Sequence, residues 1–372
     1  MECVIFKDNF MDGVNIITVE GVTYDISEFN HPGGNVIEAF QGKDATDMFL
    51  AMHSPFSRAR KTLQSLPVVK KGDAVETPFG KLHHVVMGQI VYSPFYERRV
   101  QWWLFQQLTI LSFLCTSWVA ILPVSPVLSC VVYSATIVFI SGLAHNMIHG
   151  HFGRIDPWVL ELMSGFSLKW WKNKHNVLHH CHTNVLSKDT DIHSGIFAFD
   201  ATQKSIPSQH LVFWPVLSIL RIWWGIKGLM HSTFMCCAHH VLVTSILLSC
   251  MSPFSAAQWY LAGNMISGLA LGFAVVQAHT AETIVSAQGD DHLAHTAITT
   301  RNMPTGWPHD LASGYLNYQI EHHLFPWLPC VFFEELQGLV KQSLEENKLP
   351  YTQLSWTGSA VKIHRHLRDV SS

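Results

Sequence analysis

Histidines at regular spacing are the residues of this chain that could carry chemistry. Three groups stand out, with the sequences HNMIH at 145–149, HNVLHH at 175–180 and QIEHH at 319–323. Residues four positions apart lie on one face of a helix, so each of the first two groups predicts two imidazoles on one side of a helix. Such a pair is a common arrangement of metal ligands, and His180, rotated by about 100° from its neighbour, could reach a second metal.

Histidines in a different setting precede these groups. His31 opens the sequence HPGG, GKDAT follows at 42–46, and His53 comes one segment later. Pro32 restricts the backbone to a turn, and the two glycines remove side chains where the backbone passes close to a bulky group. Two histidines on either side of a flat cofactor need an intervening segment of this kind that folds back. The alternative is a tight turn that carries an exposed histidine.

Together with Tyr24-Asp25-Ile26, these sequences resemble a cytochrome b5 domain that covers residues from about 14 to 70. The resemblance implies haem b with His31 and His53 as its two axial ligands. Because two protein ligands leave the haem iron no open position, such a domain carries electrons and does not bind oxygen or substrate.

The three later groups favour a redox metal. One histidine pair at this spacing is, by itself, more often an ordinary hydrogen-bonded or exposed pair, but three groups together favour a metal centre. A set of imidazole ligands suits zinc, copper or iron. Zinc has no redox chemistry and gives a haem electron donor nothing to reduce. We therefore expect a redox metal, and nitrogen ligation combined with oxygen chemistry favours two non-haem irons.

These groups, in this order and behind a cytochrome b5 domain, resemble the membrane front-end fatty acyl desaturases over most of the chain. The most specific sequence is LNYQIEHHLFP at 316–326, and WWK at 170–172 and KDTDI at 188–192 add to it. The resemblance implies eight iron ligands, which are His145, His149, His175, His179, His180, His279, His322 and His323. His279 is included for its position after the fourth apolar stretch. Gln319, typical of this subfamily, is implied as a ligand-like ninth member, direct or through water.

The sequence departs from the family pattern in two places. Asn146 stands where many relatives have Asp, so a carboxylate beside His145 is missing. The second group has three residues between its first two histidines, where many relatives have two. Two interpretations stay open for Asp189 and Asp191, which either accept N–H hydrogen bonds from ligand imidazoles or lie in a solvated turn.

Histidines outside the three groups receive no metal in this interpretation. We expect supporting or surface roles for His151 and His182. Interfacial or hydrogen-bonded positions are expected for His239 and His240, with lining of the active site as the alternative. Surface positions beside a bilayer are expected for a last set, which is His83, His84, His364 and His366.

Composition limits the possible partners of the 372-residue chain. Its 24 histidines equal Lys and Arg combined, while only 14% of residues are charged, against about 25% in ordinary globular chains. The net charge of −3 leaves no basic surplus with which to bind nucleic acid. A hydrophobic fraction of 48% excludes global disorder and points toward lipid. The eight cysteines show no disulfide framework, and we expect thiols.

Four stretches without charged residues are long enough to cross a bilayer as helices. They are residues 102–122, 126–143, 234–252 and 257–277. The short connections within each pair lack Lys and Arg, whereas the segments that carry the histidines contain both. The positive-inside rule therefore predicts two hairpins, with both termini and the histidines in the cytosol. Residues 211–230 include Arg221 and Lys227, so we expect an interfacial helix there and no fifth span.

The predicted architecture has several domains. A small α+β cytochrome b5-like haem domain occupies residues 1–70, and a linker and pre-membrane segment occupies 71–101. An all-α membrane desaturase domain with four spans follows at 102–372. Its cytosolic di-iron cap is built from residues 144–233 and 278–372.

The resemblance also implies an activity. It is the insertion of a cis double bond between an existing double bond and the carboxyl end of a long-chain polyunsaturated acyl chain, with O2 as co-substrate. Implied partners are NADH-cytochrome b5 reductase, a long-chain acyl lipid or acyl-CoA, and membrane lipid, with the endoplasmic reticulum membrane as location. The alternatives are a sphingolipid long-chain-base desaturase, a fused fatty acyl hydroxylase, and, more remotely, a non-enzymatic membrane haem protein or a zinc hydrolase.

Overall fold

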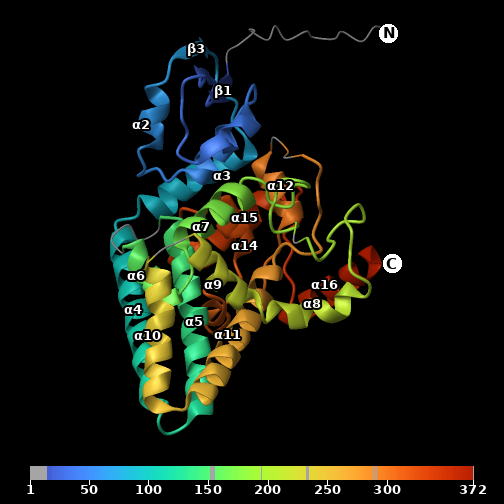
Figure 1. Cartoon of the computed structure of the whole chain (residues 1–372). Helices are drawn as coiled ribbons and strands as arrows, with labels where there is room; N and C mark the ends of the chain where they lie inside the picture. Colours follow the sequence, from blue (N-terminus) through green and yellow to red (C-terminus); the bar gives the residue numbers. More distant parts are fainter. Residues whose placement is uncertain are drawn as a thin grey trace.

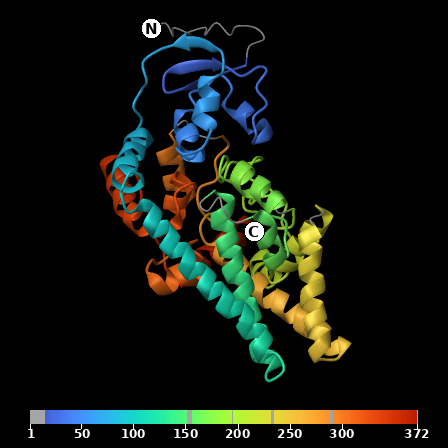
Figure 2. The same cartoon turned by 90° about the vertical axis from the view of Figure 1, so that its left-hand side faces the viewer.

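The computed structural model describes most of the chain, namely residues 15–150, 156–193, 195–231, 234–287, 289 and 291–371. An N-terminal domain lies at one end, a cap of short helices lies in the middle, and long helices extend away from the cap at the other end (Figure 1). The view turned by 90° gives the same order (Figure 2).

Three short antiparallel strands form the sheet of the N-terminal domain. They are β1 (Ile16–Val19), β2 (Val22–Asp25) and β3 (Val68–Lys71), in the order β1-β2-β3. Glu20 and Gly21 join β1 to β2 with φ values of 51° and 77°, as a tight hairpin of the favoured twist requires. Lys71 pairs with Val22 in the sheet, so the expected linker cannot begin at residue 71.

Three short helices complete this domain and hold its two histidines. They are η1 (Gly34–Phe40), α1 (Thr46–Met52) and α2 (Ala59–Gln64). His31 precedes η1, and His53 is the C-cap residue of α1. The domain has its own apolar core, which contains Ile17, Val19, Tyr24, Ile26, Ala45 and Leu63. The observed small α+β fold confirms the predicted fold class of this part.

The connection to the rest of the chain is helical and is fixed to the N-terminal domain. It comprises α3 (Pro78–Val86) and a short π-helix, η2 (Met87–Val91). Thr77 caps α3 by accepting a hydrogen bond from the Gly80 N–H at 2.9 Å. The same Thr77 hydroxyl donates to the Asp47 carboxylate of α1 at 2.5 Å. The predicted pre-membrane segment is therefore packed structure.

Two helical hairpins form the apolar end of the molecule. The first pairs α4 (Tyr96–Ile121) with α5 (Pro126–Ile148), and the second pairs α10 (Phe234–Cys250) with α11 (Pro253–Val276). The second helix of each hairpin begins with a Ser-Pro sequence, in which the serine hydroxyl accepts a backbone N–H bond. Serine at the N-cap and proline at the first position are strong signals for a helix start.

Three of the described helices, α4, α5 and α11, are long and apolar enough to cross a membrane. The predicted third span is a 17-residue apolar helix, which reaches about 25 Å and ends at Cys250 instead of residue 252. α5 continues beyond the expected end at residue 143 as far as Ile148, because the first histidine group extends the same helix. The chain is thus a multi-pass membrane protein with three to four apolar spans.

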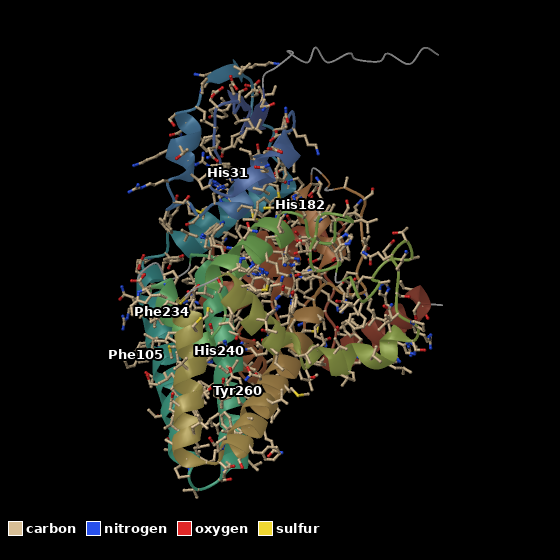
Figure 3. All side chains as sticks on the ribbon, viewed as in Figure 1. His31, Phe105, His182, Phe234, His240 and Tyr260 are labelled. Carbon is tan, nitrogen blue, oxygen red and sulfur yellow. The ribbon has the colours of Figure 1, made fainter. Side chains whose placement is uncertain are left out.

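The outer faces of these helices are apolar and exposed, as expected for contact with lipid. Phe105 of α4 is 60% exposed and Phe234 of α10 is 78% exposed. Both lie on the outside of the helical bundle (Figure 3).

The stretch predicted to be interfacial forms two helices. α8 (Gln209–Leu217) and α9 (Leu220–Met230) are bent by 60° relative to each other. α8 lies across the direction of the hairpins, beside α16 (Trp356–Val370) (Figure 1). This bend is compatible with an interfacial position, which stays a prediction.

The remaining short helices form the cap. On the N-terminal side of α8 they are α6 (Pro157–Ser164), α7 (Leu168–Lys172) and the π-helix η3 (Asn173–His179). The later ones are α12 (His292–Thr299), α13 (Trp307–Ser313), α14 (Gln319–Leu324), η4 (Cys330–Phe332) and α15 (Phe333–Glu346).

A backbone contact between two glycines joins α5 to the cap. A Cβ on Gly142 would lie 3.0 Å from the Cα of Gly314, and Gly314 has a φ of 61°. Gly142 lies about one turn before His145, and Gly314 shortly precedes α14, which carries His322. The close approach therefore sets the separation of two histidine-bearing elements.

We expect Gly142→Val to lower the melting temperature by several degrees, because the added side chain must push the backbone at Gly314 away. Gly338→Val is the matched control, since a Cβ on Gly338 of α15 meets no atom within 4 Å. Thermal unfolding in detergent checks both variants. Equal melting temperatures of the two would contradict the importance of this contact.

Candidate metal centre and interdomain cavity

The eight histidines predicted as metal ligands converge in the cap. They come from the end of α5 (His145, His149), from η3 and its C-cap (His175, His179, His180), from the residues after α11 (His279) and from α14 (His322, His323). In four of the eight, His179, His180, His322 and His323, the side chain belongs to a residue less than 3% exposed.

The second histidine group lies in a π-helix and not in an α-helix. The His180 N–H donates to the His175 carbonyl oxygen at 3.0 Å, five residues back. A π-turn contains one more residue than an α-turn, and it accommodates the longer spacing of this group. Trp171 of α7 stacks on the His175 ring, with centroids 5.5 Å apart, and helps to fix it.

Four histidines form what we call the first histidine cluster: His145, His149, His175 and His322. One ring nitrogen of each lies within 4.8 Å of the others. The Nε2 atoms of His145 and His175 are 2.8 Å apart. All donors in this cluster are nitrogens, a set that suits a borderline transition metal such as iron.

His179, His279 and His323 form the second histidine cluster, with one ring nitrogen of each within 4.8 Å of the others. The Nε2 atoms of His279 and His323 are buried and have no hydrogen-bond partner in the part of the chain that the structure describes. Buried polar atoms rarely stay unsatisfied, so these two orphaned nitrogens fit a missing metal ion.

The other nitrogen of each ring in the second cluster is held by the protein. His179 Nδ1 lies 3.1 Å from the Asp189 carboxylate, and His323 Nδ1 lies 3.1 Å from the Thr183 hydroxyl. His279 Nδ1 lies 3.1 Å from the Thr299 carbonyl oxygen. Hydrogen bonds at Nδ1 that fix the ring orientation are typical of metal-binding histidines.

His180 lies between the two clusters. Its Nε2 is 3.1 Å from Nε2 of His175 in the first cluster. Its ring stacks on His323 of the second cluster, with centroids 4.2 Å apart. This one side chain therefore contacts both clusters.

The protonation states suit metal binding. Burial, followed by the neighbouring imidazoles, holds the pKa of His175, His180 and His323 well below the usual value. Burial lowers the pKa of His279 to about 3. The rings are consequently neutral at pH 7, and neutral imidazole is the form that binds metals.

Asp189 is fully buried and accepts a hydrogen bond from the His179 imidazole, as the first of the two interpretations for this residue expects. It accepts hydrogen bonds from His179 Nδ1 and from the N–H groups of Asn184 and Asp191, at 2.8 to 3.2 Å. Burial alone would raise the pKa of Asp189, but His179 and these bonds outweigh it and keep the pKa below the ordinary value. Asp191 is partly exposed and forms an ion pair with Lys174.

Gln319 lies one helical turn before the histidines of α14 and is 6% exposed. Its side-chain amide donates to the Leu316 carbonyl oxygen at 3.0 Å. Among the hydrogen bonds of the described residues, none joins Gln319 to an imidazole. Its role as a ninth ligand stays a prediction.

The histidines outside the three groups lie in different environments. His239 Nδ1 donates to the Leu162 carbonyl oxygen at 2.9 Å. His240, labelled in Figure 3 beside Tyr260, lies 2.5 Å from the Tyr260 hydroxyl, so both histidines have the expected hydrogen-bonded positions. His182 is buried in the cap, and its pKa falls to about 4 because of burial. His151 lies outside the described residues.

Three further histidines differ from the sequence-based expectation. His83 is half-buried and stacks on Phe325 with centroids 6.2 Å apart, so its predicted surface position is wrong. His292 and His295 received no role, yet both are buried in α12. Their Nε2 atoms lie 3.2 Å and 2.9 Å from the carbonyl oxygens of His323 and Thr183. In the sequence, only the spacing of three residues, which places both histidines on one helix face, indicates that they act together.

A cavity of about 720 Å³ lies between the N-terminal domain and the cap. His31 and His53 line one side of it, and His149 and His180 line the other. Trp327, which follows the third histidine group, also lines the cavity and donates its indole N–H to the Leu50 carbonyl oxygen of α1 at 3.1 Å. The cavity thus joins the histidines of the N-terminal domain to the first cluster.

The cavity fits a flat apolar cofactor. The rings of His31 and His53 have centroids 6.1 Å apart, and His53 Nδ1 donates to the Phe49 carbonyl oxygen at 3.1 Å, which leaves Nε2 available as a ligand. The N-terminal domain lines its side with apolar side chains, which include Phe29, Val36, Ile37, Phe40, Met48 and Leu63.

Comparison with known proteins finds matches for both the N-terminal domain and the helical remainder of the chain. The family model "Fatty acid desaturase" matches residues 116–355, and "Cytochrome b5-like Heme/Steroid binding domain" matches residues 9–73. The chain is 26% identical over 380 residues to an acyl-lipid 8-desaturase of Rebecca salina, covering 91% of this chain and 87% of that one. It is 27% identical over 405 residues to an acyl-lipid (8-3)-desaturase of a Thraustochytrium species, covering 95% and 92%. It is also 27% identical over 394 residues to a Delta(6)-fatty-acid desaturase of Caenorhabditis elegans, covering 86% and 87%.

Proposed function

Because this chain belongs to the fatty acid desaturase family and carries a fused cytochrome b5-like haem-binding domain, we propose a specific reaction for it. It inserts a cis double bond between an existing double bond and the carboxyl end of a long-chain polyunsaturated acyl chain. The relatives named above are desaturases of acyl lipids and fatty acids, and they support this substrate class.

We assign the cofactors to the residues as follows. His31 and His53 hold haem b, and Gln319 is a ninth member beside the eight imidazoles that hold two irons. When bound, the haem supplies single electrons, and the two irons use dioxygen to remove hydrogen from adjacent methylene groups.

The chain's own residues position these groups. Asp189, Thr183 and the Thr299 carbonyl oxygen fix the rings of the second cluster, so that the metal-binding nitrogens need no reorganisation. Burial lowers the pKa of His175, His180, His279 and His323 and keeps these four imidazoles neutral at pH 7. Because neighbouring methylenes are chemically alike, only the position in which the protein holds the acyl chain can select between them.

The single observation that carries the proposal is the shared cavity. His31 and His53 line the same space as His149 and His180. A haem held by the first pair would lie in the cavity that His149 of the first cluster also lines, so electrons would need no second protein between haem and iron. This arrangement has no use in a zinc hydrolase, because zinc accepts no electrons.

We further propose the cellular setting. Both termini and the cap lie in the cytosol, and the membrane is that of the endoplasmic reticulum. The electron donor is NADH-cytochrome b5 reductase, and the substrate is an acyl lipid or an acyl-CoA. The charge distribution around the hairpins supports this orientation.

Expression in yeast fed singly with 18-, 20- and 22-carbon polyunsaturated acids tests the substrate. We expect a new double bond on the carboxyl side of the existing ones in at least one fed acid. The sphingoid bases of the same cells are analysed separately. A new double bond confined to the sphingoid bases would contradict the proposal in favour of a long-chain-base desaturase.

We expect Asp189→Asn to lower iron affinity by about 10- to 100-fold, because the carboxylate that orients His179 is lost. Iron titration of the purified variant measures this change. Asp73→Asn is the control, since Asp73 is exposed and lies outside the cap. Equal iron affinity of both variants would mean that Asp189 has no positioning role.

A further inference from the structure

The cavity between the two domains has a distinctive set of charges. The charged side chains that line it, histidines aside, are Arg58, Lys169 and Lys172, and all three are cations. No carboxylate belongs to this lining among the described residues. Arg58 comes from the N-terminal domain, whereas both lysines come from α7 in the cap. The domain that contains the two histidine clusters therefore supplies two of the three positive charges.

The geometry of α7 directs the two lysines to the same side. They are three positions apart and share a helix face, and both are exposed at the cavity. Trp171 between them is buried, packs against Phe166 and stacks on His175. Neither lysine forms an ion pair within the described part of the chain. Their ammonium groups are thus available to an anion in the cavity.

The residues that line the cavity indicate which kind of ligand fits it. The N-terminal domain supplies apolar side chains to the lining, and both domains supply its cations. A flat apolar molecule with two carboxylates complements both features. Haem b, with two propionates, has this chemistry, and cations with three donors bind carboxylates well.

We propose that Lys169 and Lys172 bind the propionates of the haem held by His31 and His53. This inference rests on the haem assignment of the proposed function. The desaturase domain then completes the haem site, and the haem in turn holds the two domains together. By linkage, whatever strengthens one of these contacts strengthens the other.

The two cations also tune the haem electrochemically. Reduction of the haem adds one negative charge, and a nearby ammonium group stabilises the more negative state. The lysines therefore raise the haem reduction potential, and they do so less at high ionic strength.

The test compares Lys169→Gln/Lys172→Gln with Lys61→Gln in the full-length protein. Lys61 is an exposed lysine of α2 that does not line the cavity. In the double variant we expect the midpoint potential to shift to more negative values and to lose much of its dependence on salt. Haemin affinity of the apo-protein falls by about 3- to 10-fold, as for two exposed ion pairs. Lys61→Gln leaves both quantities unchanged, and Lys169→Arg/Lys172→Arg retains the wild-type potential.

The outcomes separate this inference from the proposed function. Wild-type protein that binds haem, combined with an unshifted potential and unchanged haemin affinity in the double variant, would overturn the role of the lysines alone. Wild-type protein that binds no haem would overturn the haem assignment itself.

Discussion

His180→Ala will abolish desaturation, with product formation at least about a thousandfold below wild type. His180 has close contacts in both histidine clusters, through His175 on one side and His323 on the other. Its loss removes a donor between the two proposed iron sites and leaves a void beside five other imidazoles. Product formation in yeast and iron content of the purified variant measure the effect.

The control for this prediction is His84→Ala. His84 is an exposed histidine of α3. The control variant therefore removes the same kind of side chain, but outside the cap. We expect wild-type activity and wild-type iron content. If His180→Ala keeps both properties as well, His180 is not part of the metal centre.

The second large effect concerns the fused domain. His31→Ala and His53→Ala will each eliminate the haem absorbance and lower desaturation by about 100-fold or more, because each removes one of two proposed axial ligands. Iron content should remain at the wild-type level, since neither residue belongs to the histidine clusters. Absorbance spectra, metal analysis and product formation separate these quantities.

The separate measurement of haem and iron is informative because both histidines line the cavity that also reaches His149 and His180. A variant without haem but with full iron and no turnover identifies electron delivery as the lost step. Normal haem absorbance and normal turnover in either variant would refute the haem assignment.

Local sequence patterns predicted much of the site. The four-residue spacing of His145 and His149 corresponds to a true helix end, and the predicted start of the second span at residue 126 is the first residue of α5. His279 could be placed from its position after an apolar stretch alone, and it lies with His179 and His323. These features depend on residues close together in sequence, where periodicity carries the information.

Other features depend on contacts between distant residues and could not be predicted. The hydrogen bond from Trp327 to Leu50 joins residues 277 positions apart, and it helps to place the N-terminal domain on the cap. His295 reaches the Thr183 carbonyl oxygen across 112 positions. The cavity, the cations that line it and the hydrogen bonds from α12 to the cap follow from this packing and have no local signature.

We expect one chain to contain both a haem site and a di-iron site. Metal and haem analysis of purified protein, expressed with adequate iron, tests it most directly. We expect about two non-haem irons and one haem b per chain. Zinc in place of iron, or an intact haem with no other metal, would contradict the account.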